Sequence, residues 1–285
     1  MQVAAVVIFY NPDHSVLNNL NTYLNQVGRT FIIDNSDNPL DDSLISEINS
    51  INNIEYISNR KNLGIAAALN IGVRKAISEG YSYILTMDQD GKAAPDLISK
   101  LLDVMTASDN IGIVAAEHMD PDLHNLPREN ITKEVLFTMT NGNLLNLSAY
   151  QKSGEYLEEL FIDHVDHEFC LRLNKNGFKI IKTNNTFIYH KLGKAVKKRI
   201  LGINLYPTYH LPIRLYYRTR NRFYVNDLYK KIFPGYVKED RRHMLREIFD
   251  IILCEKDLFN KFKMILKGYG DYRKKQLGEF KGASR

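Results

Sequence analysis

YSYILTMDQD, residues 81–90, is the stretch of sequence that decides the fold. Its apolar run, residues 83–87, has the length and composition of a buried strand, and it stops at two acids one residue apart, Asp88 and Asp90. Such a strand end places both acids at the carboxyl edge of a sheet, where open α/β folds bind ligands. Two carboxylates there can hold a hard divalent cation, which neutralises a diphosphate. The alternative is that both acids are turn residues before Gly91.

Strand patterns and helix patterns alternate on both sides of this stretch. The expected strands are residues 3–9, 30–34, 54–58, 83–87 and 111–116, and the expected helices are residues 16–26, 41–49, 65–79 and 95–108. Such alternation is typical of βαβ units, which build a parallel sheet with helices packed against it. We therefore expect an α/β fold with a mostly parallel sheet flanked by helices.

Charge divides the chain into two parts. Residues 1–194 carry 16 Lys and Arg against 24 Asp and Glu, whereas residues 195–285 carry 22 against 9. The second part interleaves aromatic and aliphatic residues with its cations, as amphipathic helices do at an anionic membrane surface. The alternative is that these helices pack on the main domain and their cations are solvated. Nucleic acid is not expected as a partner, because no recognised nucleic-acid-binding motif is present.

Length and composition indicate an ordinary globular protein. The chain has 285 residues, 44% hydrophobic and 25% charged, which suits one large domain with an appendage. We expect an α/β domain over residues 1–194 and a basic helical region over residues 195–285. Cys170 and Cys254 fit no CxxC pattern, so neither a zinc site nor a disulfide framework is indicated. With no basic leader and no bilayer-length apolar run, we expect a cytoplasmic protein held peripherally at the inner face of the cell membrane.

Polar residues follow four successive predicted strands. They are Tyr10 with Asn11, residues 34–36, Asn59 with Arg60, and residues 88–90. Because the carboxyl ends of parallel strands meet at one edge, these residues outline a single crevice. Asp34 can accept a hydrogen bond from the imide N–H of uracil or thymine, or it can cap the loop before the next helix.

A glycine opens the third predicted helix, in the segment NLGIAAALN at residues 62–70. The glycine lets the backbone approach a ligand, and the first N–H groups of the helix suit a phosphate or a sugar. The segment lacks GxGxxG and the Walker sequence, so neither a dinucleotide fingerprint nor a P-loop kinase is supported.

Short motifs recur along the whole chain in a characteristic order. They are YNP at 10–12, DNS at 34–36, NLGIAAALN at 62–70, DQD at 88–90, TNG at 140–142, FIDHVDHEFCLR at 161–172, YHKLG at 189–193, HLPIRLYYRTRN at 210–221 and KGYGDYRKKQLG at 267–278. In this order they resemble family 2 glycosyltransferases of the GT-A fold, and most of all the rhamnosyltransferase branch. The resemblance implies inverting transfer of L-rhamnose from dTDP-β-L-rhamnose to a lipid-linked or cell-surface polysaccharide. Galactofuranosyltransferases are relatives, so UDP-galactofuranose or another UDP-hexose is the alternative donor.

The resemblance assigns residues to the donor side. It places Tyr10, Asp34, Asn62, Gly64, Asp88 and Gln89 against the nucleotide sugar. It implies a divalent cation, Mg²⁺ or Mn²⁺, held by Asp90 and by His190, which follows the apolar run 186–189. Such a cation acts as a Lewis acid on the leaving diphosphate. The donor half would span about residues 1–116 and the acceptor half about residues 117–194.

The acceptor hydroxyl must lose its proton as it attacks, and a carboxylate is the simplest base. Within residues 161–172, the family pattern places this base at Asp166, with Glu168 as a supporting or acceptor-binding group. Asn141 and Gly142 would line the acceptor side. Acids are also favoured at a helix N-terminus, so helix capping is the alternative for both carboxylates.

Departures from the family pattern fall on the acceptor side. His164 and His167 stand where the family often has an aromatic or aliphatic residue, and Asn141 stands in TNG where TSG is common. Asp163 is the weaker candidate for the base. A nucleotidyltransferase is disfavoured, because the first strand is not followed by a basic, glycine-rich loop. A non-catalytic nucleotide-sugar-binding scaffold is the alternative function from another class. The sequence also leaves open whether the chain forms a homodimer.

Overall fold

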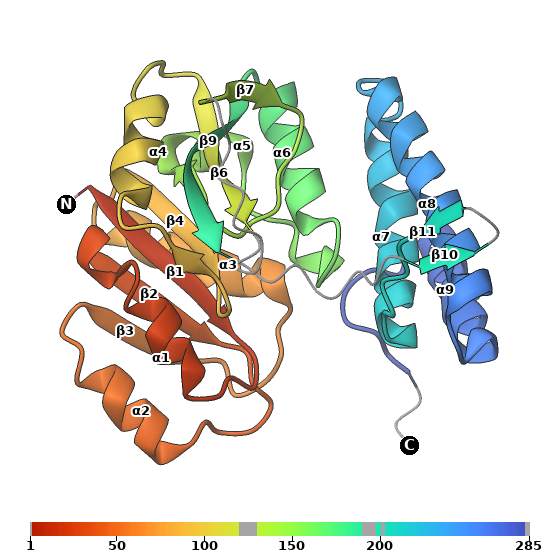
Figure 1. Cartoon of the computed structure of the whole chain (residues 1–285), viewed down its shortest axis with the longest axis horizontal. Helices are drawn as coiled ribbons and strands as arrows, with labels where there is room; N and C mark the ends of the chain where they lie inside the picture. The colour runs from red at the N-terminus through yellow and green to blue at the C-terminus, as the bar shows by residue number, and fades with distance from the viewer. Residues whose placement is uncertain (1, 120–129, 190–197, 201–202, 283–285) are drawn as a thin grey trace. The chain divides into compact units, whose positions relative to one another are not determined.

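The computed structural model describes residues 2–119, 130–189, 198–200 and 203–282. The chain forms two compact units (Figure 1). The first, the sheet unit, comprises Met1–Glu158 and Val165–Lys191. The second, the helical unit, comprises Glu159–His164 and Leu192–Arg285. Within the described ranges, no helix of either unit is both long enough and apolar enough to cross a membrane.

The first half of the sheet is parallel, as the sequence predicts. Its strands are β1 (Val3–Phe9), β2 (Arg29–Asp34), β3 (Ile54–Ser58) and β4 (Tyr83–Asp88). They lie in the order β3-β2-β1-β4, and each neighbouring pair is parallel. Phe9 pairs with Asp34, and Asp34 pairs with Ser58, so these strands end together. The polar residues that follow the strands therefore share one edge of the sheet.

The second half of the sheet is mixed rather than parallel. Its strands are β5 (Lys92–Ala93), β6 (Ile111–Met119), β7 (Thr132–Val135), β8 (Asn143–Asn146) and β9 (Lys179–Tyr189). β8 runs antiparallel between β4 and β6, β6 and β9 are parallel, and β5 and β7 are antiparallel to β9. Gly142, with a φ of 76°, precedes β8 and donates its N–H to the Thr86 carbonyl (2.8 Å). This turn brings the chain back beside β4, so one antiparallel strand separates β4 from β6, which runs in the same direction as the first four strands.

Helices cover both faces of the sheet (Figure 1). On one face lie α1 (Ser15–Leu20), α2 (Asp42–Asn49) and α4 (Leu97–Met105), and on the other lie α3 (Ile65–Ser78), α5 (Leu147–Ser153) and α6 (Val165–Lys175). Val7 and Phe9 of β1 point to the first face and join its helices in one apolar core. On the second face, a Cβ on Gly72 of α3 would lie 2.2 Å from Cγ2 of Val6, so glycine permits this close approach. Tyr150 of α5 extends the second layer, because its hydroxyl donates to Oδ1 of Asn70 on α3 (2.8 Å).

The helix expected after the first strand is interrupted. α1 ends at Leu20, and a short 3-10 turn follows at Leu24–Gln26. The hydroxyl of Thr22 donates to the Asn19 carbonyl (2.6 Å) and accepts the N–H of Ala93 (2.9 Å). These side-chain bonds compete with the helical pattern and tie the turn to β5.

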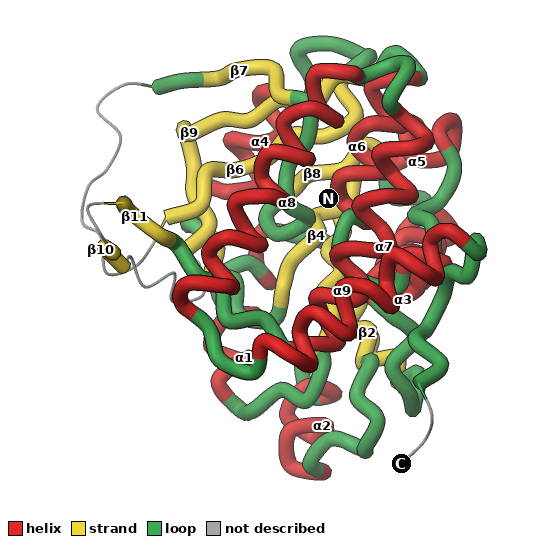
Figure 2. The backbone as a smooth tube through the Cα atoms, turned by 90° about the vertical axis from the view of Figure 1, so that its right-hand side faces the viewer, coloured by secondary structure: helices red, strands yellow, loops and turns green. Residues whose placement is uncertain are grey.

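The helical unit contains three long helices and a two-stranded hairpin, coloured by secondary structure in Figure 2. They are α7 (Pro212–Tyr229), α8 (Pro234–Cys254), α9 (Leu258–Arg273), β10 (Lys198–Ile200) and β11 (Ile203–Leu205). Pro212 and Pro234 each stand in the first turn, where a missing N–H costs nothing. α7 and α9 approach closely at Gly268, where a Cβ would lie 2.5 Å from the Tyr216 carbonyl oxygen.

Candidate active site

Gln89, between the two acids of DQD, ties the end of β4 to the loop after β1. Its Oε1 accepts the backbone N–H of Tyr10 (2.8 Å), and its backbone carbonyl accepts Nδ2 of Asn19 (2.8 Å). These two bonds fix the backbone on which Asp88 and Asp90 stand. Nothing near Asn19 in the sequence indicates this contact, because its partner lies 70 residues away.

Asp34 ends β2 in a buried position, with 1% of its surface exposed. Its Oδ1 accepts the N–H of Ser36 (2.9 Å), and its Oδ2 accepts the hydroxyl of Tyr56 (2.7 Å). Burial, and then this hydrogen bond, raises the pKa of Tyr56, so the phenol stays a donor at neutral pH. Each carboxylate oxygen has a second lone pair, so the contact with a base imide stays a prediction.

The start of α3 is joined to the end of β2 by amide side chains. Asn35 donates Nδ2 to the carbonyl of Gly64 (3.0 Å) and accepts Nδ2 of Asn59 (2.8 Å). Gly64 has a φ of 85°, and its N–H donates to Oδ1 of Asn62 (2.9 Å). α3 begins at the next residue, and Gly64 carries no side chain that could cap its first N–H groups.

Asn141 lies against the carboxyl end of β4. It is buried, and its Oδ1 accepts the N–H of Asp88 (3.1 Å), while its carbonyl lies 2.8 Å from Nε2 of His118. The next residue, Gly142, cannot be replaced without strain, because a Cβ would lie 2.2 Å from Cγ1 of Ile188. The structure thus brings Asn141, predicted to line the acceptor side, into direct contact with Asp88, predicted to bind the donor.

The predicted metal ligands are only partly described. Asp90 is exposed in the turn after β4, and Asp88 is half-buried, with its carbonyl accepting the N–H of Gly91 (3.1 Å). His190 lies outside the described residues. Within the described ranges, no three His, Cys, Asp or Glu side chains converge as a metal site would require. The two carboxylates still fit a hard cation, because Mg²⁺ and Mn²⁺ take diphosphate and water oxygens as further ligands.

The two predicted acids of α6 stand in different surroundings. Glu168 is 2% exposed, and Arg172 binds both of its oxygens, through Nε (3.0 Å) and Nη2 (2.8 Å). Arg172 also donates to the carbonyls of Ser153 (2.8 Å) and Glu155 (2.7 Å), which links α6 to the segment after α5. Asp166 is half-buried in the first turn, where its Oδ1 accepts the N–H of the following residue (2.9 Å). Glu168 is therefore held in an ion pair that fixes the helix.

The predicted residues fall into two groups. The strand-end residues are linked by the hydrogen bonds above, whereas Asp166 and Glu168 stand on α6, which packs on β9 and α5. Neither Tyr56 nor Arg172 was predicted from the sequence as a contact of a site residue. The i,i+4 spacing of Glu168 and Arg172 was an available signal for that pair.

Comparisons with known proteins agree on one family. The model of Glycosyl transferase family 2 matches residues 4–156. The dTDP-rhamnosyl transferase RfbF of Shigella flexneri is 32% identical over 239 residues, which are 78% of this chain and 78% of that one. Polyprenol monophosphomannose synthase of Mycolicibacterium smegmatis is 25% identical over 144 residues, 46% of this chain and 54% of that one.

Solved structures with the same fold are more distant in sequence. GalNAc-T7 with UDP, GalNAc and Mn²⁺ has a TM-score of 0.63 at 14% identity, over 95% of this chain and 55% of that one. TarS 1-349 of S. aureus in complex with UDP-GlcNAc has a TM-score of 0.60 at 12% identity, over 97% of this chain and 82% of that one. At these identities the likeness concerns the fold alone.

Proposed function

Because the chain belongs to glycosyl transferase family 2, we propose that it transfers L-rhamnose from dTDP-β-L-rhamnose, with inversion, to a hydroxyl of a lipid-linked or cell-surface polysaccharide. The choice of sugar is supported by the 32% identical relative described as a dTDP-rhamnosyl transferase. The alternative donor is UDP-galactofuranose or another UDP-hexose, since two structures of the same fold are described with UDP or UDP-GlcNAc.

The observation that carries the proposal is the fixed end of β4. Gln89 holds this turn through two hydrogen bonds, so Asp88 and Asp90 stand on a fixed turn beside the end of β1. We assign Tyr10, Asp34, Asn62, Gly64, Asp88 and Gln89 to the donor. The imide N–H of thymine would meet Asp34, and the first N–H groups of α3 suit the diphosphate or the sugar.

The metal in this proposal is Mg²⁺ or Mn²⁺. Asp90 and His190 would hold it, with Asp88 on the donor side. When bound, the cation supplies Lewis-acid stabilisation of the charge on the leaving diphosphate.

The transfer step assigned to Asp166 is a single displacement. Its carboxylate takes the proton of the acceptor hydroxyl, and the freed electron pair forms a bond to the anomeric carbon. The bond from that carbon to the diphosphate oxygen breaks, and its electron pair leaves with the nucleoside diphosphate. Attack from the side opposite the leaving group inverts the anomeric centre. Glu168 supports α6, and Asn141 and Gly142 border the acceptor.

We propose an anionic membrane surface as a partner of the helical unit. Exposed apolar side chains recur along its last two helices, namely Leu245, Phe249, Ile252, Phe259 and Leu266. Exposed cations accompany them, with Lys256 between the two helices and Lys263 on α9. Apolar and basic groups on one helix surface are the combination that binds the interface of an anionic leaflet.

Vesicle sedimentation tests this contact. The wild-type chain should bind vesicles of phosphatidylcholine with phosphatidylglycerol more than vesicles of phosphatidylcholine alone, and Phe259→Ser with Leu266→Ser should reduce that binding. Met139→Ser, at an exposed apolar residue of the sheet unit, is the control. Equal binding by both variants would rule out the assigned surface.

A donor screen tests the function itself. With Mg²⁺ or Mn²⁺ and an acceptor extract, release of nucleoside diphosphate should be fastest from dTDP-rhamnose. Turnover of a UDP-hexose alone would make the rhamnose assignment wrong. No turnover of any donor, with binding intact, would favour the scaffold alternative.

A further inference from the structure

A cavity of about 290 Å³ lies between the three long helices of the helical unit, and the described residues that line it all belong to that unit. α7 and α9 approach closely at Gly268, whereas α8 is joined to α7 through the long side chains of Arg218 and Arg222. Because the side chains at a contact set the distance between helix axes, these arginines hold α8 away from α7. The space that results is close to the lower limit of the range for small-molecule sites, about 300–1,000 Å³.

The lining of this cavity is mostly apolar. All three helices contribute, with Leu215 and Phe223 on α7, Met244 and Ile248 on α8, and Ile265 on α9. Met244 and Ile248 are four residues apart, so they share one face of α8. An apolar wall of this kind does not hold water by hydrogen bonds, and it gains dispersion contacts from a hydrocarbon chain. The cavity therefore suits an apolar ligand.

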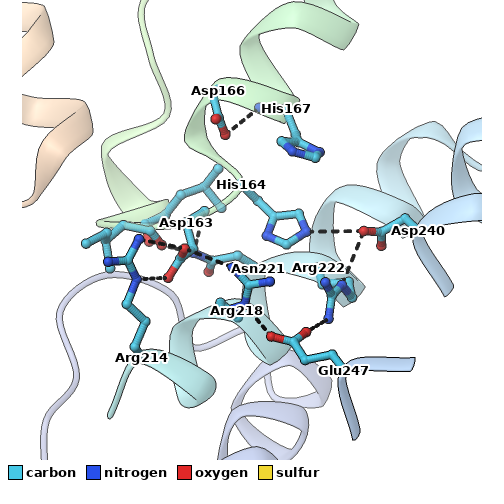
Figure 3. A network of polar contacts seen from close by, with 12 residues as sticks. Asp163, His164, Asp166, His167, Arg214, Arg218, Asn221, Arg222, Asp240 and Glu247 are labelled. Carbon is cyan, nitrogen blue, oxygen red and sulfur yellow. Dashed lines mark hydrogen bonds and ion pairs between the residues drawn. The ribbon is translucent and has the colours of Figure 1, made fainter. Parts of the chain in front are cut away.

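The charged residues of the lining belong to a network of ion pairs (Figure 3). Among the described lining residues, charged side chains come from Arg218, Arg222 and Glu247 only. Nε of Arg218 and Nη1 of Arg222 lie 2.9 Å and 3.0 Å from the carboxylate of Glu247. Nε of Arg222 also lies 3.2 Å from Oδ1 of Asp240.

This network leaves the wall without a net charge. Burial raises the pKa of Glu247, but the charges of Arg218 and Arg222 outweigh burial and hold that pKa below its ordinary value. The two guanidiniums are thus matched by the carboxylates of Glu247 and Asp240. A compensated wall does not attract a phosphate or a carboxylate, so the charged end of a ligand would stay outside the cavity.

The mouth of the cavity lies at α9, on the exposed apolar surface of the helical unit. Leu266 and Tyr269 line the cavity, yet they are 69% and 39% exposed. Leu266 is also one of the residues assigned above to the membrane surface. Lys263 is exposed and stands three residues before Leu266, on the same face of α9. The mouth therefore joins an apolar entrance to a cation that suits an anionic head group.

We propose that this cavity binds one hydrocarbon chain of an anionic membrane lipid, whose head group stays at the mouth beside Lys263. The inference rests on the proposed membrane contact of the helical unit, and it adds a lipid chain as a specific ligand. The apolar lining accepts the chain, and the compensated network excludes the head group from the interior. Continuity with the exposed apolar surface gives the chain a path from the leaflet.

Titration calorimetry with a soluble lipid tests the proposal on the whole chain. Lauroyl-lysophosphatidylglycerol, used below its critical micelle concentration, should bind, whereas glycerophosphoglycerol, which has the same head group without a chain, should not. Ile248→Phe places a larger side chain in the cavity and should weaken binding of the lysolipid at least about tenfold, because the chain loses its space.

The matched control is Ile252→Phe, the same substitution one turn further along α8. Ile252 is 49% exposed and is not among the described residues that line the cavity. This variant should bind the lysolipid within about twofold of wild type. If Ile248→Phe does not fold, Ile265→Phe narrows the cavity from α9 and serves in its place.

Three results would overturn the proposal. They are a wild-type chain that does not bind the lysolipid, glycerophosphoglycerol binding as tight as that of the lysolipid, and wild-type affinity in a folded Ile248→Phe or Ile265→Phe variant. Vesicle sedimentation distinguishes failure of the membrane contact. A wild-type chain that binds the lysolipid but not vesicles with phosphatidylglycerol refutes the membrane contact alone, and one that binds the vesicles but not the lysolipid refutes the chain site alone.

Discussion

The sheet edge and the interior of the helical unit use polar groups in opposite ways. At the edge, neutral amides and backbone groups make the fixing contacts, as Gln89, Asn35 and Asn141 do. In the helical unit, carboxylates are paired with guanidiniums, as in Glu247 with Arg218 (2.9 Å) and Arg222 (3.0 Å).

This difference separates structural acids from acids available for chemistry. A carboxylate matched by arginines has its charge compensated, so it stabilises the fold and is a poor base or metal ligand. Amides fix a loop without adding a compensating charge of their own. The contrast predicts that acids at the two places respond differently to substitution.

The largest effect is expected at Asp166. Asp166→Asn keeps the size of the side chain and removes its basicity, so kcat should fall about 1,000-fold with donor binding retained. Steady-state kinetics and donor calorimetry measure the two quantities separately. Asp103→Asn, an exposed acid on α4, is the control. Near-wild-type turnover of Asp166→Asn would refute its assignment as the base.

Arg222 gives the next largest effect, on stability rather than on chemistry. Its Nε lies 3.2 Å from Asp240 and its Nη1 lies 3.0 Å from Glu247, all with side chains at most 14% exposed. Arg222→Met removes the guanidinium from buried Asp240 and leaves Glu247 with Arg218 alone, so it should lower the free energy of unfolding by about 3–5 kcal/mol. Urea unfolding measures the change.

The control for Arg222 is an exposed arginine on the same unit. Arg242→Met removes a surface pair with Glu239 and should cost less than about 1 kcal/mol. Equal losses for the two variants would mean that burial does not set the strength of these pairs, and the comparison between the two regions would fail.

Asp90 should show a smaller effect, confined to metal-dependent binding. Asp90→Ala should raise the Mg²⁺ or Mn²⁺ concentration needed for half-maximal donor binding by at least about tenfold, because a ligand is lost. The free energy of unfolding should be nearly unchanged, since Asp90 is exposed. An unchanged metal titration would argue against this ligand, and a large loss of stability would place Asp90 with the structural acids.

Much of the carboxyl edge of the sheet could be predicted, because its information is local. The strands 3–9 and 54–58 were predicted with the bounds that the structure has, since an apolar run followed by polar residues is a signal over a few positions. The same signal predicts that Asp88 and Asp90 lie at the end of a strand.

The rest depends on contacts between distant positions. Asn221 bonds residues 58 to 61 positions away, so nothing near it in the sequence indicates that residues 159–164 group with the helices. The antiparallel entry of β8 depends on Gly142 meeting Thr86 and Ile188, which are also distant in the sequence. The periodicity of hydrophobic residues gives no information on contacts between residues that are distant in the sequence.

The smallest effect is expected at Asp271, a buried acid with a half-exposed partner. Lys267 binds its Oδ1 (2.6 Å) and Oδ2 (2.9 Å), and the hydroxyl of Tyr216 donates to Oδ2 (2.8 Å). Burial raises the pKa of Asp271, but the hydrogen bonds from Lys267 and Tyr216 outweigh burial and hold the pKa below its ordinary value of 3.8. A lowered pKa stabilises the fold above that value, and the stabilisation is lost as the pH falls through the folded value.

Asp271→Asn should therefore lower the free energy of unfolding by roughly 0.5–1 kcal/mol at neutral pH, a small amount because Lys267 is 47% exposed. The difference from wild type should shrink as the pH falls from the ordinary carboxyl pKa through the lower pKa of the folded chain, below which both chains lack the charge. Urea unfolding at neutral and acid pH measures it, with Glu279→Gln as the exposed control in the same unit. An equal difference at both pH values would mean that shape, not charge, makes Asp271 structural, and would remove it from the paired acids.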